Sequence, residues 1–147
     1  MTVLFLDVDG VLNNRSFHLE RGHDELHPID PSMLDRLNRV VEKTGCDVVL
    51  SSAWRYMGLK RVQEILDRNG AKFRLMDQTP RLNATRGREI KTWMYGHKVL
   101  DTQMAIVDDD SDMEDLMHRL VQTTFDSGLQ EDHVARLIEL LNEENEE

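Results

Sequence analysis

Short apolar runs alternate with amphipathic stretches along this chain of 147 residues, and this alternation restricts the fold more than any other feature. The runs are Val3–Leu6, Asp47–Leu50, Lys72–Met76, Met104–Val107 and, more weakly, Leu120–Thr123. Most of them are rich in β-branched or aromatic residues and none is long, so we interpret them as buried strands.

The stretches between these runs carry apolar residues at helical spacing. The predicted helices are Pro31–Gly45, Leu59–Leu66, Arg86–Tyr95, Met113–Leu120 and Val134–Leu141, with Gly45, Asn69-Gly70 and Gly96 as stop signals. Strands that alternate with helices in this way are typical of the α/β class. We therefore expect residues 1–147 to form a single Rossmann-like domain, with a five-stranded parallel sheet in a three-layer α/β/α arrangement.

Polar residues follow three of the predicted strands at the point where each strand ends. They are Asp7 and Asp9, the pair Ser51-Ser52, and the triplet Asp108-Asp109-Asp110. Parallel strands connected by right-handed crossovers end at one edge of the sheet, where ligands of such sheets bind. The sequence therefore predicts one polar crevice formed by all three strand ends.

The acids of this crevice predict a metal site. Asp7 and Asp9 are two residues apart in an extended segment, so they point the same way, and Gly10 allows the sharp turn that follows. Bare carboxylates are costly to bury, and a divalent cation removes that cost. Mg²⁺ prefers oxygen ligands of this kind. We expect Mg²⁺ near Asp7 and Asp9, with a further ligand from Asp108 or Asp109.

At this point a resemblance becomes specific. The segment Asp7-Val8-Asp9-Gly10-Val11 resembles the first motif of the haloacid dehalogenase (HAD) superfamily of phosphatases. Ser51 resembles its second motif, and Asp108-Asp109 resembles its fourth. Arg86 occupies the place of the third, which is usually a lysine.

The third motif leaves alternatives open. Arginine keeps the charge of lysine but differs from it in shape and reach, so Arg88 or Lys91 could share the role of Arg86.

The resemblance covers about residues 2–142 and extends to longer phrases. These are Leu50–Arg55, Arg86–Ile90 with Trp93, Val107–Asp112 and Thr123–Leu129. In them the chain is similar to the HAD domain of Swiss Army Knife RNA repair proteins and, more distantly, to the phosphatase domain of polynucleotide kinase-phosphatases. The resemblance implies the strand order 5-4-1-2-3.

The resemblance also implies a chemistry that suits these residues. Asp7 would attack phosphorus to form an aspartyl-phosphate, and Asp9 would protonate the leaving oxygen and later activate water. Mg²⁺ would be held by Asp7, the backbone carbonyl of Asp9 and Asp109. Ser51 would donate a hydrogen bond to the phosphoryl group, and Arg86 would stabilise its charge.

Other residues near these motifs are candidates for substrate binding, namely Ser52, Arg55 and Arg88. Arg55 is either a contact for a substrate phosphate or a surface residue at the start of a helix. Asp110 and Asp112 either support the metal ligands or cap helices, and Asp112 precedes Met113 in a position that suits a helix start.

Three further residues have structural interpretations. We expect Trp54 and Trp93 to lie in the core, and Cys46 to be a small buried hydrophobic residue rather than a nucleophile.

Residues 10–31, which contain His18, His23 and His27, are polar and rich in turn-forming residues. We interpret them as a flap after the first strand, and the resemblance implies that it leans over the site. A second metal site at these histidines is the less favoured interpretation, because no cysteine accompanies them.

The spacing of the motifs indicates an open site. About 40 residues separate Gly10 from Ser51 and about 35 separate Ser51 from Arg86, too few in either gap for an inserted cap domain. An open site favours a large substrate, so phosphorylated 3′ or 5′ ends of a polynucleotide are the first hypothesis and small nucleotides or sugar phosphates the alternative.

The distribution of charge bears on the same question. The formal net charge is −10, yet residues 55–91 hold ten basic and four acidic residues. This basic segment is either a phosphate-binding surface or a set of ordinary solvated helix faces.

Several classes are disfavoured. No apolar run approaches the roughly 20 residues that span a bilayer, and the single cysteine excludes an internal disulfide. We expect a cytoplasmic protein with no membrane association, no evident obligate protein partner, and a frayed acidic tail at residues 143–147. A phospho-receiver would carry its acidic pair first, and a non-catalytic binding protein would be expected to lack Asp7 or Asp9.

Overall fold

The computed structural model describes residues 1–21 and 27–143. The strands are β1 (Val3–Leu6), β2 (Asp47–Leu50), β3 (Leu75–Gln78), β4 (Met104–Asp108) and β5 (Leu120–Gln122). The α-helices are α1 (Arg15–Arg21), α2 (Pro31–Thr44), α3 (Leu59–Arg68), α4 (Arg86–His97) and α5 (Glu131–Asn142). The described residues also form three 3₁₀ helices: η1 (Ala53–Met57), η2 (Asp101–Gln103) and η3 (Glu114–Arg119).

The five strands form one parallel sheet in the order β3-β2-β1-β4-β5, which confirms the predicted order read from the other edge. Strand β1 lies at the centre, where Val3 is opposite Asp47 on one side and Met104 on the other. All strands point the same way, so the residues after β1, β2 and β4 meet at one edge.

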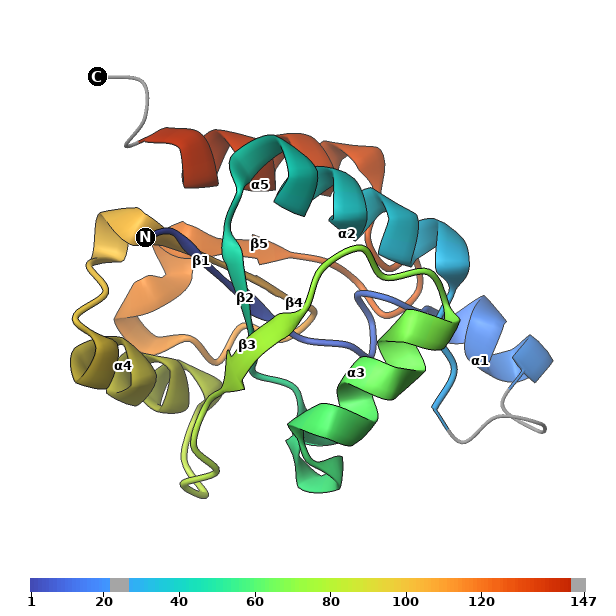
Figure 1. The fold of residues 1–147 in the computed structure, drawn as a ribbon, viewed down its shortest axis with the longest axis horizontal. Helices are drawn as coiled ribbons and strands as arrows, with labels where there is room; N and C mark the ends of the chain where they lie inside the picture. The colour runs from blue at the N-terminus through green and yellow to red at the C-terminus, as the bar shows by residue number, and fades with distance from the viewer. Residues whose placement is uncertain (22–26, 144–147) are drawn as a thin grey trace.

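Helices cover both faces of the sheet, as the three-layer prediction requires. Leu4 and Leu6 of β1 face the core shared with α2, α3 and α5, whereas Val3 and Phe5 face the core under α4. In Figure 1, α2 and α5 lie side by side at the top and α4 lies across the sheet at the lower left. Each fully buried side chain of this kind stabilises the fold by roughly 1.5–3 kcal/mol.

Helix α2 shows how local sequence sets an element's ends. Asp30 accepts a hydrogen bond from the backbone N–H of Ser32 at the N-cap, and Pro31 occupies the first turn. Gly45 ends the helix with φ 66° and donates its N–H to the carbonyl of Val41, as the sequence predicts.

The predicted stop at Gly96 is wrong, because helix α4 continues to His97. The turn that ends α4 is made by Lys98, at φ 57°, whose N–H donates to the carbonyls of Met94 and Tyr95. A lysine can therefore occupy the left-handed position that glycine usually takes.

The third strand is Leu75–Gln78 rather than Lys72–Met76. Gln63 of α3 donates from Nε2 to the carbonyl of Phe73 and accepts the N–H of Leu75, so this backbone is bonded to the helix before the strand begins. A register shift at Val48 and Val49 accompanies this late start.

The element predicted over Met113–Leu120 is a 3₁₀ helix and not an α-helix. Glu114 has φ 51°, which breaks the regular helical backbone at its first residue. The fifth strand ends at Gln122, one residue earlier than predicted.

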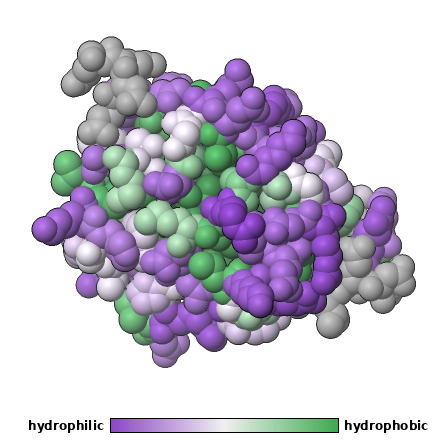
Figure 2. Space-filling model, in the orientation of Figure 1, coloured by the Kyte–Doolittle hydropathy of each residue, from purple (hydrophilic) through white to green (hydrophobic). Residues whose placement is uncertain are grey.

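The outer surface is mixed in character. Figure 2 shows a face on which hydrophilic residues surround a hydrophobic band near the middle. In the part of the chain that the structure describes, no helix combines the length and the apolar character that a bilayer crossing needs. Cys46 is 5% exposed, and burial raises the pKa of its thiol, in agreement with its interpretation as a packed residue.

Candidate active site

Three aspartates from two neighbouring strands meet at the predicted edge of the sheet. Asp7 directly follows β1, where its N–H donates to the carbonyl of Val107, and Asp108 ends β4 with Asp109 next to it. One carboxylate oxygen from each of the three lies within 4.8 Å of the others. Asp7 is 5% exposed and Asp108 is 1% exposed, so this three-aspartate cluster is largely shielded from water.

Burial raises the pKa of Asp7 well above its usual range, and the neighbouring charge of Asp108 raises it further. Burial also raises the pKa of Asp108, although Arg86 acts against the shift. Two ionised carboxylates this close repel each other, and one cation nearby does not neutralise three of them. The cluster therefore has the charge deficit that a bound divalent cation would relieve.

Gly10 gives Asp109 its place in this cluster. The glycine has φ 80°, and a Cβ built on it would lie 2.3 Å from Oδ2 of Asp109. Its N–H donates to Oδ1 of Asn13, and its carbonyl accepts the hydroxyl of Thr123 at 2.6 Å. A residue without a side chain is required here because the loops after β1 and β4 approach so closely.

Asp9 lies apart from the three-aspartate cluster, although it is only two residues from Asp7. Its two carboxylate oxygens accept hydrogen bonds from Nε1 of Trp54 and Nδ2 of Asn13, each at 3.0 Å. Nε2 of His18, on α1 of the predicted flap, lies 3.5 Å from Oδ1. Half of the Asp9 side chain is exposed, so it can exchange protons with a ligand or with water.

The sequence prediction missed the roles of Trp54 and Asn13 in holding Asp9. Trp54 is 4% exposed and packs in the core as predicted, but its indole N–H reaches the site. No motif signals this contact, because 45 residues separate the donor from the acceptor.

The two serines after β2 have different surroundings. The hydroxyl of Ser51 is buried and has no hydrogen-bond partner among the described residues, although its backbone N–H donates to the carbonyl of Leu6. Ser52 instead caps η1, with its Oγ accepting the N–H of Trp54. A buried hydroxyl without a partner is costly, so Ser51 is the serine that a ligand oxygen would satisfy.

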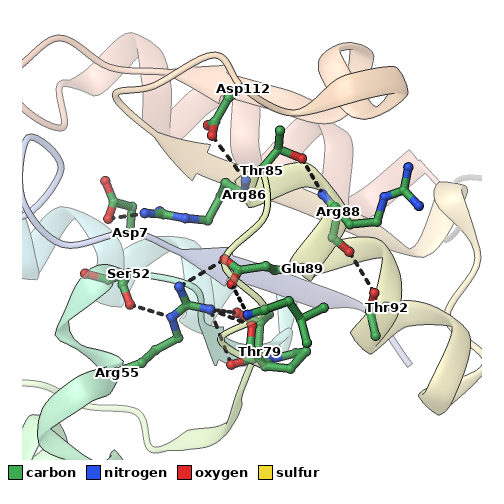
Figure 3. A network of polar contacts seen from close by, with 12 residues as sticks. Asp7, Ser52, Arg55, Thr79, Thr85, Arg86, Arg88, Glu89, Thr92 and Asp112 are labelled. Carbon is green, nitrogen blue, oxygen red and sulfur yellow. Dashed lines mark hydrogen bonds and ion pairs between the residues drawn. The ribbon is translucent and has the colours of Figure 1, made fainter.

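Arg86 is the basic residue that the structure brings to Asp7. Its Nη1 lies 2.7 Å from Oδ2 of Asp108 and 3.4 Å from Oδ1 of Asp7. Burial opposes the charge of Arg86, but the carboxylates of Asp108 and Asp7 raise the pKa of its guanidinium. Figure 3 shows the Arg86 side chain directed at Asp7 and that of Arg88 directed away.

The two alternatives to Arg86 are used elsewhere. Arg88 forms an ion pair with Glu114, and Lys91 forms ion pairs with Glu114 and Asp115. Both acids belong to η3.

Asp112 holds the start of α4, and the prediction that it caps its own helix is wrong. Its Oδ2 accepts the N–H of Arg86 at 3.1 Å, and its carbonyl accepts the N–H of Gly87 at 3.0 Å. A Cβ on Gly87 would lie 2.4 Å from the carbonyl carbon of Met113, so α4 begins in direct contact with the loop after β4. This contact brings Arg86 to Asp108.

The structure excludes the surface position predicted for Arg55, whereas its predicted role in substrate binding stays a prediction, because Arg55 also lines the pocket described below. Arg55 is 7% exposed and forms a buried ion pair with Glu89, whose Oε1 lies 3.0 Å from Nη2. Its Nη1 also donates to Oγ1 of Thr79 and to the carbonyl of Pro80. The guanidinium thus connects η1, the loop after β3 and α4 (Figure 3).

The predicted flap is described only in part. Helix α1 lies in it, and the ring of His27 is near Trp54, with Nε2 3.4 Å from the hydroxyl of Tyr56. His23 lies outside the described residues, as do residues 144–147 of the predicted acidic tail. Within residues 1–21 and 27–143, the three-aspartate cluster is the one group that could hold a metal, and it contains no histidine.

A pocket of about 570 Å³ opens beside Arg86. It is lined by residues of η1, of the loop before α4, of α4 itself, and by Asp112. Arg86 belongs both to this pocket and to the carboxylate cluster.

Comparisons with known proteins agree with this geometry. Residues 3–134 match a family described as the HAD domain in Swiss Army Knife RNA repair proteins. The chain belongs to this family. The match includes all four motif positions, from Asp7 to Asp109, and so confirms the resemblance found in the sequence.

Among solved structures, the HAD fold is seen in a protein from Mesorhizobium loti that is described as a HAD-like phosphatase. The two chains superpose with a TM-score of 0.56 at 17% identity, over 96% of this chain and 86% of the other. No curated protein matches the sequence.

Proposed function

We propose that this HAD domain is a magnesium-dependent phosphatase that hydrolyses phosphomonoesters through an aspartyl-phosphate on Asp7. The observation that carries the proposal is the set of groups around Asp7: two further carboxylates, the guanidinium of Arg86, and the buried, unpartnered hydroxyl of Ser51. The similarity in fold to a HAD-like phosphatase supports it.

The donor set fits the expected metal. Three carboxylates with oxygens within 4.8 Å of one another, two of them with raised pKa, suit a hard divalent cation such as Mg²⁺. Asp7, Asp108 and Asp109 would hold it, with the backbone carbonyl of Asp9 as a further ligand. The bound cation would neutralise the charge of the carboxylates and of the phosphoryl oxygens.

The residues of the chain divide the reaction between them. An oxygen of Asp7 forms a bond to phosphorus while the bond from phosphorus to the leaving oxygen breaks, and Asp9 gives that oxygen its proton. Asp9 then takes a proton from the water that releases phosphate from Asp7. Trp54 and Asn13 hold the Asp9 carboxylate in place for both steps.

Two groups stabilise the transferring phosphoryl group. Arg86 is held beside Asp7 by its contacts at the start of α4, and its guanidinium matches the charge that spreads over the phosphoryl oxygens. The Ser51 hydroxyl, which has no hydrogen-bond partner among the described residues, donates to a phosphoryl oxygen.

We propose phosphorylated ends of a polynucleotide as the substrate. Membership of a family named for RNA repair proteins supports this choice, as do the ten basic residues of segment 55–91. The short crossovers also support it. The helices described between the motifs are α1 and α2 after β1, and η1 and α3 after β2, and an open site without a cap domain favours a large substrate. The pocket of about 570 Å³ would equally hold a small nucleotide or sugar phosphate, which is the second candidate.

The decisive experiment measures hydrolysis of an aryl phosphate with and without Mg²⁺. We expect activity that requires the metal and that falls by about a thousandfold or more in Asp7→Asn, because this change removes the nucleophile and keeps the shape. The matched control is Asp110→Asn, an exposed acid outside the three-aspartate cluster. Activity that survives Asp7→Asn would refute the mechanism.

A further inference from the structure

We infer that Arg81 binds a second phosphate of the substrate, the phosphodiester next to the reacting end of a nucleic-acid strand. This inference rests on the proposed function and extends it to one more residue and one more substrate group. Arg81 lines the pocket beside Arg86 and has no part in the chemistry described above.

The position of the pocket suits the leaving group of a phosphate ester. Its volume of about 570 Å³ lies in the range of small-molecule sites, roughly 300–1,000 Å³. Because Arg86 contacts Asp7 and also lines the pocket, a phosphate bound at Asp7 would place the rest of its molecule at the pocket's entrance.

The charge of the pocket favours an anion. Its two acids are already bonded: Glu89 to Arg55 and Asp112 to the N–H of Arg86. Arg81 is exposed and has no carboxylate within 4.0 Å among the described residues. The lining holds three arginines against two acids, so its net charge is positive, and a guanidinium forms paired hydrogen bonds with phosphate oxygens.

The backbone around Arg81 is fixed on both sides. The carbonyl of Pro80 accepts a hydrogen bond from Arg55 at 3.0 Å, and the N–H of Leu82 donates to Oε2 of Glu89 at 2.7 Å. The buried pair Arg55 and Glu89 thus holds the residues before and after Arg81. A binding group on a fixed backbone loses less conformational entropy when its ligand arrives.

The other lining residues indicate that phosphate and not base is recognised. Ala53, Asn83 and Ala84 are small, and no aromatic residue lines the pocket within the described part of the chain. Proteins that bind single-stranded nucleic acid through its bases stack them on aromatic side chains. A pocket with a guanidinium and no stacking surface binds the sugar-phosphate backbone and has no preference for a particular base.

The test compares kcat/KM for end-phosphorylated RNA oligonucleotides, phosphorylated at either the 3′ or the 5′ end, with kcat/KM for an aryl phosphate. We expect Arg81→Gln to lower the ratio of kcat/KM for the oligonucleotide to kcat/KM for the aryl phosphate about tenfold, and Arg81→Lys to lower this ratio less. We also expect the slope of log kcat/KM against log salt to decrease by about 0.7 for the oligonucleotide, since one phosphate contact is lost.

Arg74→Gln is the matched control. Arg74 lies in the same basic segment, its side chain is 77% exposed, and it does not line the pocket. The ratio should stay at its wild-type value in this variant. An equal decrease in Arg74→Gln and Arg81→Gln would overturn the inference, because it would mean that general positive charge attracts the strand.

A nucleoside 3′,5′-bisphosphate tests whether the substrate is a nucleic-acid strand, because it carries two phosphates in a small molecule. If the enzyme prefers the bisphosphate to the oligonucleotide, the assignment to a nucleic-acid strand is overturned. If the oligonucleotide is preferred and the preference disappears in Arg81→Gln, the assignment is supported.

The two proposals can fail separately. Hydrolysis that does not depend on Asp7 would refute the phosphatase mechanism alone. Binding of a fluorescein-labelled, end-phosphorylated oligonucleotide, followed by anisotropy, would then still test Arg81: a tenfold weaker Kd in Arg81→Gln supports the inference, and an unchanged Kd overturns it.

Discussion

The crevice contains two buried clusters of charge that differ in how well the protein satisfies them. In one, Arg55 and Glu89 are matched in charge, and the guanidinium also bonds Thr79 and Pro80. In the other, three carboxylates share the single cation of Arg86, and the pKa of Asp7 is raised well above its usual range by burial and by Asp108.

The difference shows which cluster serves the fold and which serves a ligand. A satisfied buried pair fixes neighbouring loops, and removing one partner leaves a buried charge alone. An unsatisfied cluster costs stability and is retained where a ligand or a reaction needs it. The matched pair therefore holds the pocket, and the unmatched cluster is where chemistry is expected.

The largest effect should come from breaking the matched pair. Arg55→Met leaves Glu89 buried without its cation, so we expect a loss of about 3–5 kcal/mol in the free energy of unfolding, measured by urea denaturation. The control is Arg39→Met, which breaks the surface pair with Glu131 and should leave the free energy of unfolding close to that of wild type. Equal losses in the two variants would show that the buried pair has no special role.

Next in size should be the effect of removing the cation from the unmatched cluster. Arg86→Met should lower kcat on an aryl phosphate by about 10²–10³-fold in saturating Mg²⁺, because the phosphoryl charge loses its partner, and Arg86→Lys should recover part of the loss. Arg88→Gln is the control and should stay within about twofold, since Arg88 pairs with Glu114. A similar decrease in Arg88→Gln would assign the third motif to both arginines.

The smallest expected effect is on thermal stability at neutral pH, and it follows from the raised pKa of Asp7. In the metal-free protein Asp7 has a raised pKa, so the folded state binds its proton more tightly than the unfolded state. Its contribution to stability is complete below the unfolded pKa and is lost as the pH rises through the folded pKa. At pH 7 in a chelator, Asp7→Asn should therefore raise Tm by a few degrees, as measured by differential scanning fluorimetry, and Mg²⁺ should raise the Tm of wild type more than that of the variant. A lower Tm in Asp7→Asn would contradict the predicted repulsion.

Much of the fold was predictable because it depends on local patterns. The five strands and the ends of α2 follow from apolar runs and from signals such as Pro31 and Gly45, whereas the sheet order was implied by the resemblance to the HAD superfamily. Errors occurred where a tertiary contact replaces a local signal. The third strand starts late because Gln63 bonds its backbone, and α4 passes Gly96 because Lys98 makes the final turn.

The candidate site, too, was predictable only in part from the sequence. Asp7, Ser51 and Arg86 were identified from motifs at the ends of strands or at the start of a helix, and the structure brings all three to one crevice. The contacts of Trp54 with Asp9 and of Asp112 with the N–H of Arg86 were not identified, because each joins residues distant in sequence. Hydrogen bonds of this range depend on the folded arrangement and leave no periodic pattern.

The hydrogen bond from Trp54 to Asp9 makes the protein its own optical reporter. The chain contains two tryptophans, and they lie on opposite faces of the sheet: Trp54 donates to Asp9, whereas Trp93 donates to Asp77 under α4. With Trp93 replaced by phenylalanine, the remaining fluorescence would come from an indole bonded to the proposed acid–base residue. Events at the reacting centre could then be followed in real time without a label.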